Sequence, residues 1–81
     1  MDFVSLTTDL SVFGVVEYIG YNGDDQSRLI LSMTNINNDV QSVEQITNSI
    51  NALFVTEFPI VEHFSINQQS LKAVYLQQTN V

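Results

Sequence analysis

The chain has 81 residues, no cysteine, and nine acidic residues against two basic ones, which gives a formal net charge of −7. A chain this short forms one small domain over residues 1–81, and two cations cannot build the basic face that nucleic-acid binding needs. The lack of cysteine excludes disulfides and sulfur-ligated zinc. No apolar run approaches the roughly 20 residues of a membrane-spanning helix, so we expect no direct membrane insertion.

The N-terminal segment predicts a strand followed by a brief helix. Bulky and polar residues alternate over residues 3–7, which is typical of a short strand. Thr8 or Asp9 is a suitable N-cap for a helical turn, and Gly14 is a suitable end for it. We therefore expect a strand over residues 3–7 and a short helix before Gly14.

A β-hairpin is the clearest feature of the sequence. Residues 15–21 are rich in β-branched and aromatic side chains, and Asn22-Gly23 follows them directly. Asn-Gly between two apolar runs is a strong hairpin signal, and the expected returning strand covers residues 28–33. The two segments should pair as antiparallel neighbours across a loop that includes residues 24–27.

The middle of the chain predicts an amphipathic helix. Asn38 or Asp39 is a suitable N-cap, with Gln41 three residues after Asn38 as in a capping box. Beyond it, apolar residues recur at three- and four-residue steps, which places them on one helical face. That apolar stripe consists of Val40, Val43, Ile46, Ile50, Leu53 and Phe54.

The C-terminal third predicts one more strand and a terminal helix. Pro59 ends the preceding connection, and residues 60–66 alternate in the manner of a strand. Residues 67–69 are polar turn formers, and Ser70 is a suitable N-cap for a last short helix. The expected apolar side of this helix consists of Leu71, Val74 and Tyr75.

This element order predicts an α+β fold. Two strand-helix-strand units joined by the Asn22-Gly23 hairpin give a ferredoxin-like βαββαβ domain. It would have a four-stranded antiparallel sheet with both helices on one face, plus the short C-terminal helix. The other sheet face would then need the terminal helix or a partner to cover it. No repeat of fixed period is evident.

The candidate chemical motifs of the sequence are weak, and we predict no catalytic residue, no metal site and no cofactor. The scattered glycines at positions 14, 20 and 23 form no phosphate-binding loop. Glu62-His63 offers two possible metal ligands, but neighbours on a regular strand point to opposite faces. Asp24-Asp25 lacks the ligand spacing of a calcium loop. A hydrolytic triad of Ser70, His63 and Asp39 lacks a nucleophile elbow.

The end of the chain resembles the C-terminal domain of ATP-binding subunits of ABC transporters, chiefly of the drug-, sodium- and antibiotic-export type. Those subunits close with a strand and then a helix of the pattern Ser-Leu-acid-acid-Val-Phe-Leu-x-Leu-Thr-Gly. In this chain Lys72 and Ala73 replace the two acidic residues. The matching positions are Ser70, Leu71, Val74, Leu76 and Thr79, with Tyr75 in place of the Phe.

The resemblance implies a non-catalytic accessory or regulatory domain, expected to be part of a larger ATPase subunit. Its partners would be its own nucleotide-binding domain, a second copy of the subunit, or both. It would lie in the cytoplasm, peripheral to the membrane through the transporter. The matching residues of the terminal helix would pack at this interface or on the domain itself.

Two other classes of function fit the sequence. The predicted element order is also that of an ACT-type ligand-sensing module, although such modules carry a glycine-bearing loop after their first strand, and Thr7–Leu10 has none. A charge of −7 on 81 residues would also suit a small acidic inhibitor that blocks a basic groove.

Overall fold

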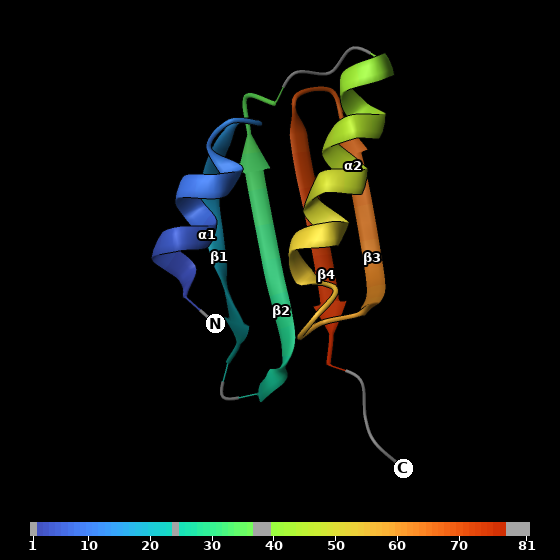
Figure 1. Ribbon diagram of the computed structural model, residues 1–81. Helices are drawn as coiled ribbons and strands as arrows, with labels where there is room; N and C mark the ends of the chain where they lie inside the picture. The colour runs from blue at the N-terminus through green and yellow to red at the C-terminus, as the bar shows by residue number, and fades with distance from the viewer. Residues whose placement is uncertain (1, 24, 37–39, 78–81) are drawn as a thin grey trace.

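The structure is a computed structural model that describes residues 2–23, 25–36 and 40–77 (Figure 1). It has two helices and one four-stranded antiparallel sheet of strand order β1-β2-β4-β3, so the α+β class and the sheet are confirmed. Figure 1 shows both helices on the same face of the sheet. The elements are α1 (Phe3–Leu10), β1 (Val15–Asn22), β2 (Asp25–Thr34), α2 (Val40–Phe54), β3 (Ile60–Asn67) and β4 (Ser70–Leu76).

The element order is αββαββ, and two of the predicted elements are wrong. The predicted strand over residues 3–7 lies in helix α1, and the predicted terminal helix is strand β4. The first correction removes a strand at the N-terminal end of the predicted order, and the second adds a strand at its C-terminal end. The ferredoxin-like βαββαβ order is therefore replaced by two successive helix-hairpin units.

Helix α1 begins at an aspartate cap. The Asp2 carboxylate accepts hydrogen bonds from the backbone N–H groups of Val4 at 3.0 Å and Ser5 at 3.3 Å, and from the Ser5 hydroxyl at 2.7 Å. These bonds, the Ser5 hydroxyl first, lower the pKa of Asp2. Leu6 and Leu10, four residues apart, are buried against the sheet. The cap and this spacing make a short helix stable in contact with the core.

The predicted β1–β2 hairpin is confirmed, and β2 begins earlier than predicted, at Asp25. Strands β3 and β4 form a second hairpin, in which Asn67 pairs with Ser70 across the turn. Ser70 therefore caps no helix, and its hydroxyl donates to the Asn67 carbonyl at 3.0 Å. The buried residues of β4 alternate, at Leu71, Ala73 and Tyr75, which is the period of a strand.

The core lies between the helices and the sheet. Ile46, Ile50 and Phe54 of the predicted apolar stripe are buried on α2, and the predicted cap at Asn38 or Asp39 lies outside the described residues. Near its C-terminal end, the Phe54 ring packs on Tyr75 with centroids 4.5 Å apart. The Tyr75 hydroxyl donates to Asn51 Oδ1 at 3.0 Å, which ties α2 to strand β4. The buried residues are Leu6, Leu10, Leu29, Leu31, Met33, Ile36, Ile46, Ile50, Phe54, Phe58, Leu71, Ala73 and Tyr75.

The two halves of the fold repeat each other. Each half is a helix followed by a hairpin, and the central strands β2 and β4 pair antiparallel around Leu31 and Ala73. An approximate twofold axis normal to the sheet therefore relates the halves, in agreement with the opposite directions of α1 and α2 in Figure 1. The outer strands have related sequences, Val-Val-Glu-Tyr-Ile-Gly-Tyr-Asn in β1 and Ile-Val-Glu-His-Phe-Ser-Ile-Asn in β3. The spacing between equivalent elements varies, from 37 residues between the starts of α1 and α2 to 45 between those of β1 and β3, so the fold repeats without a fixed sequence period.

Candidate functional site

The sheet face opposite the two helices, called here the open face, is the candidate site. Along each strand the helix-facing residues alternate with residues of the open face. Because Leu29, Leu31 and Met33 of β2 are buried under the helices, the intervening residues point to the open face. The resulting open face includes Tyr18, Gly20, Arg28, Ile30, Ser32, Lys72, Val74, Leu76, His63 and Ser65.

The centre of the open face is apolar. Ile30 and Val74 are partners on the two central strands, and Leu76 pairs with Ile60 on β3. Ile60 is 44% exposed, and the three others are partly exposed. These side chains adjoin one another over three strands, so they form a patch rather than scattered exposed residues. Contiguous exposed apolar patches on a small domain mark interaction surfaces.

Tyr18 extends this patch toward the β1 edge. Its hydroxyl donates to the Tyr21 carbonyl at 3.2 Å, which turns the ring along the strand. A Cβ atom at Gly20 would lie 3.1 Å from the same hydroxyl oxygen, so the ring covers the glycine backbone. The residue is still 51% exposed. Tyr18 therefore offers a broad aromatic surface that is already held in place.

The positively charged side chains of the chain also lie on the open face. Arg28 and Lys72 are the two basic residues of the sequence, and His63 is its one histidine. Arg28 Nη2 lies 3.1 Å from Glu62 Oε1, with 38% and 43% of the two side chains exposed. Lys72 forms no ion pair within the part of the chain that the structure describes. At such exposure the Arg28 pair adds little stability.

The helix layer has the opposite electrostatic character. Neither helix contains a Lys, Arg or His residue. Asp2, Asp9, Glu44 and Glu57 belong to this layer or its ends, and all four are exposed. The domain is therefore polarised, with an acidic helix side and an open face that carries Arg28 and Lys72 beside the ion-paired Glu62.

A β-bulge in each outer strand shapes the edges of the sheet. The register shifts between Val16 and Tyr18 in β1 and between Val61 and His63 in β3. The extra residues are Glu17 and Glu62, which occupy equivalent places in the two halves, and both are exposed. Bulges and charged residues on edge strands oppose pairing with another strand. The edges of this sheet are thus poorly suited to binding a partner strand.

The bulge in β3 corrects the sequence interpretation of Glu62 and His63. Glu62 reaches Arg28, and His63 Nε2 lies 3.3 Å from Ser65 Oγ, so both side chains lie on the open face. The rule that neighbours point to opposite faces fails at this bulge. Among the described residues, no group of three or more His, Cys, Asp or Glu side chains could hold a metal ion.

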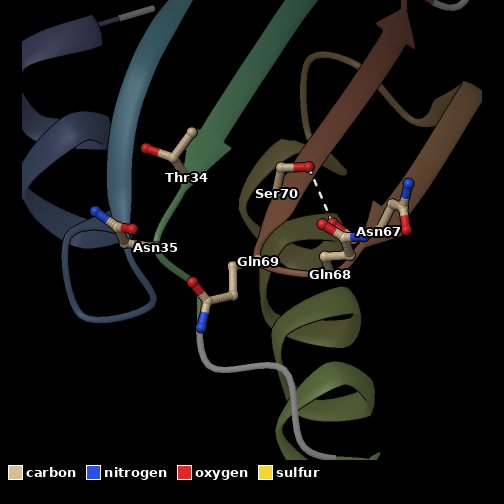
Figure 2. Close-up of a pocket in the computed structure, with 6 residues that line it drawn as sticks. All are labelled: Thr34, Asn35, Asn67, Gln68, Gln69 and Ser70. Atoms are coloured by element: carbon tan, nitrogen blue, oxygen red, sulfur yellow. Dashed lines mark hydrogen bonds between the residues drawn. The ribbon is translucent and has the colours of Figure 1, made fainter.

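A shallow polar pocket lies at one end of the sheet (Figure 2). Its volume is about 240 Å³, and its lining consists of Thr34, Asn35, Asn67, Gln68, Gln69 and Ser70. The lining contains amides and hydroxyls but no group that titrates near neutral pH. Small-molecule sites are usually larger, roughly 300–1,000 Å³, and mainly apolar. We interpret this pocket as the space between two turns, which the hydrogen bond from Ile36 N to Gln69 O at 3.2 Å holds together.

The residues predicted as an interface motif divide between the two faces of β4. Leu71 and Tyr75 point into the core, whereas Val74 and Leu76 lie on the open face. The predicted common apolar side of Leu71, Val74 and Tyr75 is therefore wrong, because it needed helical spacing. Ser70 lines the pocket, and Thr79 lies outside the described residues.

Sequence reasoning missed the residues that make the open face. Arg28, Ile30 and Ser32 alternate with the apolar Leu29, Leu31 and Met33, and this pattern already separates the two faces of β2. Residues 70–76 do not alternate in this way, because the segment ends in four consecutive apolar residues, Ala73 to Leu76. The sequence predicts a helix for that segment, so the predicted fold does not place Lys72 and Val74 beside Ile30.

Comparisons with known proteins give no relative: no family model, no curated protein and no solved structure matches the chain. The relationship to ABC-transporter subunits stays a prediction, and the terminal helix on which it depended is a strand. No helix among the described residues is long and apolar enough to cross a membrane.

Proposed function

We propose that this chain is a non-catalytic accessory domain that binds a protein surface through its open face. The observation that carries the proposal is the apolar patch of Ile30, Val74, Leu76 and Ile60, continued by the Tyr18 ring. Burying such side chains releases roughly 25 cal/mol per Å² of apolar area, which is the main driving force of association.

The charges beside the patch indicate which kind of surface the partner would have. Arg28 and Lys72 flank the apolar centre, and Lys72 forms no ion pair within the described residues. A complementary surface would be apolar at its centre and carry carboxylates facing these two cations. A basic surface would instead be drawn to the acidic helix side, as expected for an acidic inhibitor.

A non-catalytic role fits the lining of the pocket and the position of His63. The pocket has no acid or base, and His63 is exposed, with its Nε2 atom 3.3 Å from the Ser65 hydroxyl. General acid-base catalysis needs a titratable group in a shaped site. The resemblance to ABC-transporter accessory domains predicts the same class of role, and a cytoplasmic location follows from that resemblance alone.

Site-specific photo-crosslinking in cells tests this proposal. A photo-reactive phenylalanine analogue at Ile30 samples the open face, and the same analogue at Val4, which is 78% exposed on α1, is the matched control. We expect a saturable adduct with one defined protein from position 30 only. Excess free wild-type chain should compete for an adduct with a different protein, whereas a Val74→Lys chain should not.

Equal crosslinking from positions 30 and 4, or none from position 30, would overturn the proposal. A competed adduct from position 4 alone would favour the acidic-inhibitor alternative, because that position lies on the acidic helix side.

A further inference from the structure

We infer that the surface bound by the open face is the open face of a second copy of this chain. The two copies would form a twofold dimer with their sheets packed face to face and their helices outward. This inference rests on the proposed function and names its partner. The open face has the apolar centre of such a partner, and its Glu62 carboxylate, which pairs with Arg28 within the chain, is the one that a second copy would bring to these cations.

Electrostatics favours this arrangement over others between two copies. Each chain has a net charge of −7, so two copies repel when their acidic helix layers approach. Packed sheets lie about 10 Å apart, and a helix layer adds about 10 Å on each side. The two acidic layers of a face-to-face dimer would thus be about 30 Å apart, several times the screening length of about 8 Å at physiological salt.

The edges of the sheet argue for face packing rather than strand pairing. Glu17 and Glu62 occupy equivalent bulges in the two outer strands, so both edges have an interrupted ladder and an exposed acid. An extended sheet made of two copies would have to pair across one of these bulges. The open face has no such obstacle.

The size of the open face predicts a reversible dimer. Four strands spaced about 4.8 Å apart, each about eight residues long at 3.3 Å per residue, cover about 500 Å² per copy. Two such faces give a total near the lower limit of about 1,000 Å² for specific interfaces. We therefore expect association that depends on protein concentration and strengthens as salt screens the repulsion between the acidic copies.

Analytical ultracentrifugation of the full chain tests this inference, from about 10 μM to about 1 mM and at about 0.05 M and 0.5 M NaCl. We expect the dimer fraction to rise with the protein concentration and with the NaCl concentration. Val74→Lys should weaken the dimer by about tenfold or more, because it places an ammonium group in the apolar centre. Val4→Lys adds the same charge on α1 and should leave the dissociation constant within about twofold.

Val74→Thr is the second variant, for the case in which Val74→Lys does not fold. It keeps the β-branched shape, and the hydroxyl in the apolar centre should still weaken the dimer. A wild-type chain that stays monomeric under all conditions would overturn the second copy as partner. So would a dimer that Val74 substitutions leave intact, or one that Val4→Lys abolishes.

The two proposals fail separately. A monomeric wild-type chain that still gives a competed adduct from position 30 with a different protein would overturn the dimer and leave the protein-binding role standing. Loss of both signals would overturn both.

Discussion

Replacing Tyr75 by phenylalanine removes one buried hydroxyl and leaves the ring that packs on Phe54 in place. The hydroxyl donates to Asn51 Oδ1 at 3.0 Å, and this bond joins strand β4 to helix α2. A neutral hydrogen bond of this kind contributes about 0.5–1.5 kcal/mol to stability. At neutral pH we therefore expect Tyr75→Phe to lower the free energy of unfolding by about 1 kcal/mol.

The same substitution should reverse its effect at high pH. Burial raises the pKa of Tyr75 well above its usual value of 10.0. The stability from the neutral hydroxyl is fully present below pH 10, and it is lost as the pH rises toward the raised pKa, because the unfolded chain ionises first. The loss is at most about 1.4 kcal/mol per pH unit. The wild-type advantage of about 1 kcal/mol should thus vanish between about pH 10 and pH 11.

Urea unfolding of both proteins, followed by circular dichroism from pH 7 to about pH 11.5, measures this crossover. The difference between wild type and variant isolates Tyr75, since every other titrating group is common to both. A double-mutant cycle with Asn51→Ala should give a coupling energy of about 1 kcal/mol at neutral pH. If wild type stays more stable than the variant by the same free energy over the whole pH range, the conclusion that the Tyr75 hydroxyl is buried and un-ionised in the folded state is refuted.

Five further substitutions test particular contacts, each by urea unfolding. Gly14→Ala should lower the free energy of unfolding by about 1–3 kcal/mol, because its Cβ would lie 2.8 Å from the Thr34 carbonyl oxygen. Gly20→Ala should lower it less, since only the movable Tyr18 side chain is close. Equal losses for the two variants would contradict this packing. Gln68→Gly should raise stability by up to about 1 kcal/mol relative to Gln69→Gly, because φ at Gln68 is +56°. Leu71→Ala should lower the free energy of unfolding by about 2–5 kcal/mol, because this leucine is buried under the helices. A loss below about 1 kcal/mol would contradict its position in the core.

The sequence was sufficient to predict the elements whose signals are local and strong. The β1–β2 hairpin follows from its dense β-branched segments around Asn22-Gly23, and helix α2 follows from a long apolar stripe. The strand over residues 60–66 follows from alternation, and the structure extends it by one residue, to Asn67. The pattern of α2 extends over 15 residues, which is enough to separate a period of 3.6 from a period of two.

The sequence patterns of the two terminal elements are too short to decide between a helix and a strand. Residues 3–7 alternate like a strand, but the Asp2 cap and the pair Leu6 and Leu10 stabilise a helix once it packs on the sheet. Residues 70–76 contain apolar side chains at both helical and strand spacings. Pairing with β2 on one side and β3 on the other decides for a strand, and that pairing is a tertiary effect.

The incorrect helix at residues 70–76 is also the reason that the sequence does not predict the candidate site. Val74 and Lys72 belong to the open face only when residues 70–76 form a strand beside β2. The bulges were also beyond local prediction, although the recurrence of Glu17 and Glu62 within two similar octapeptides was visible in the sequence.

Isotope-filtered nuclear Overhauser spectroscopy on an equimolar mixture of ¹³C-labelled and unlabelled chains tests the central claim most directly, because it detects only contacts between two copies. We predict intermolecular contacts from the methyl groups of Ile30, Val74 and Leu76, and none from Val4 on α1 or from Val12 in the turn that follows it, both 78% exposed. Intermolecular contacts confined to Val4 and Val12, or none at a concentration of about 1 mM, would contradict it.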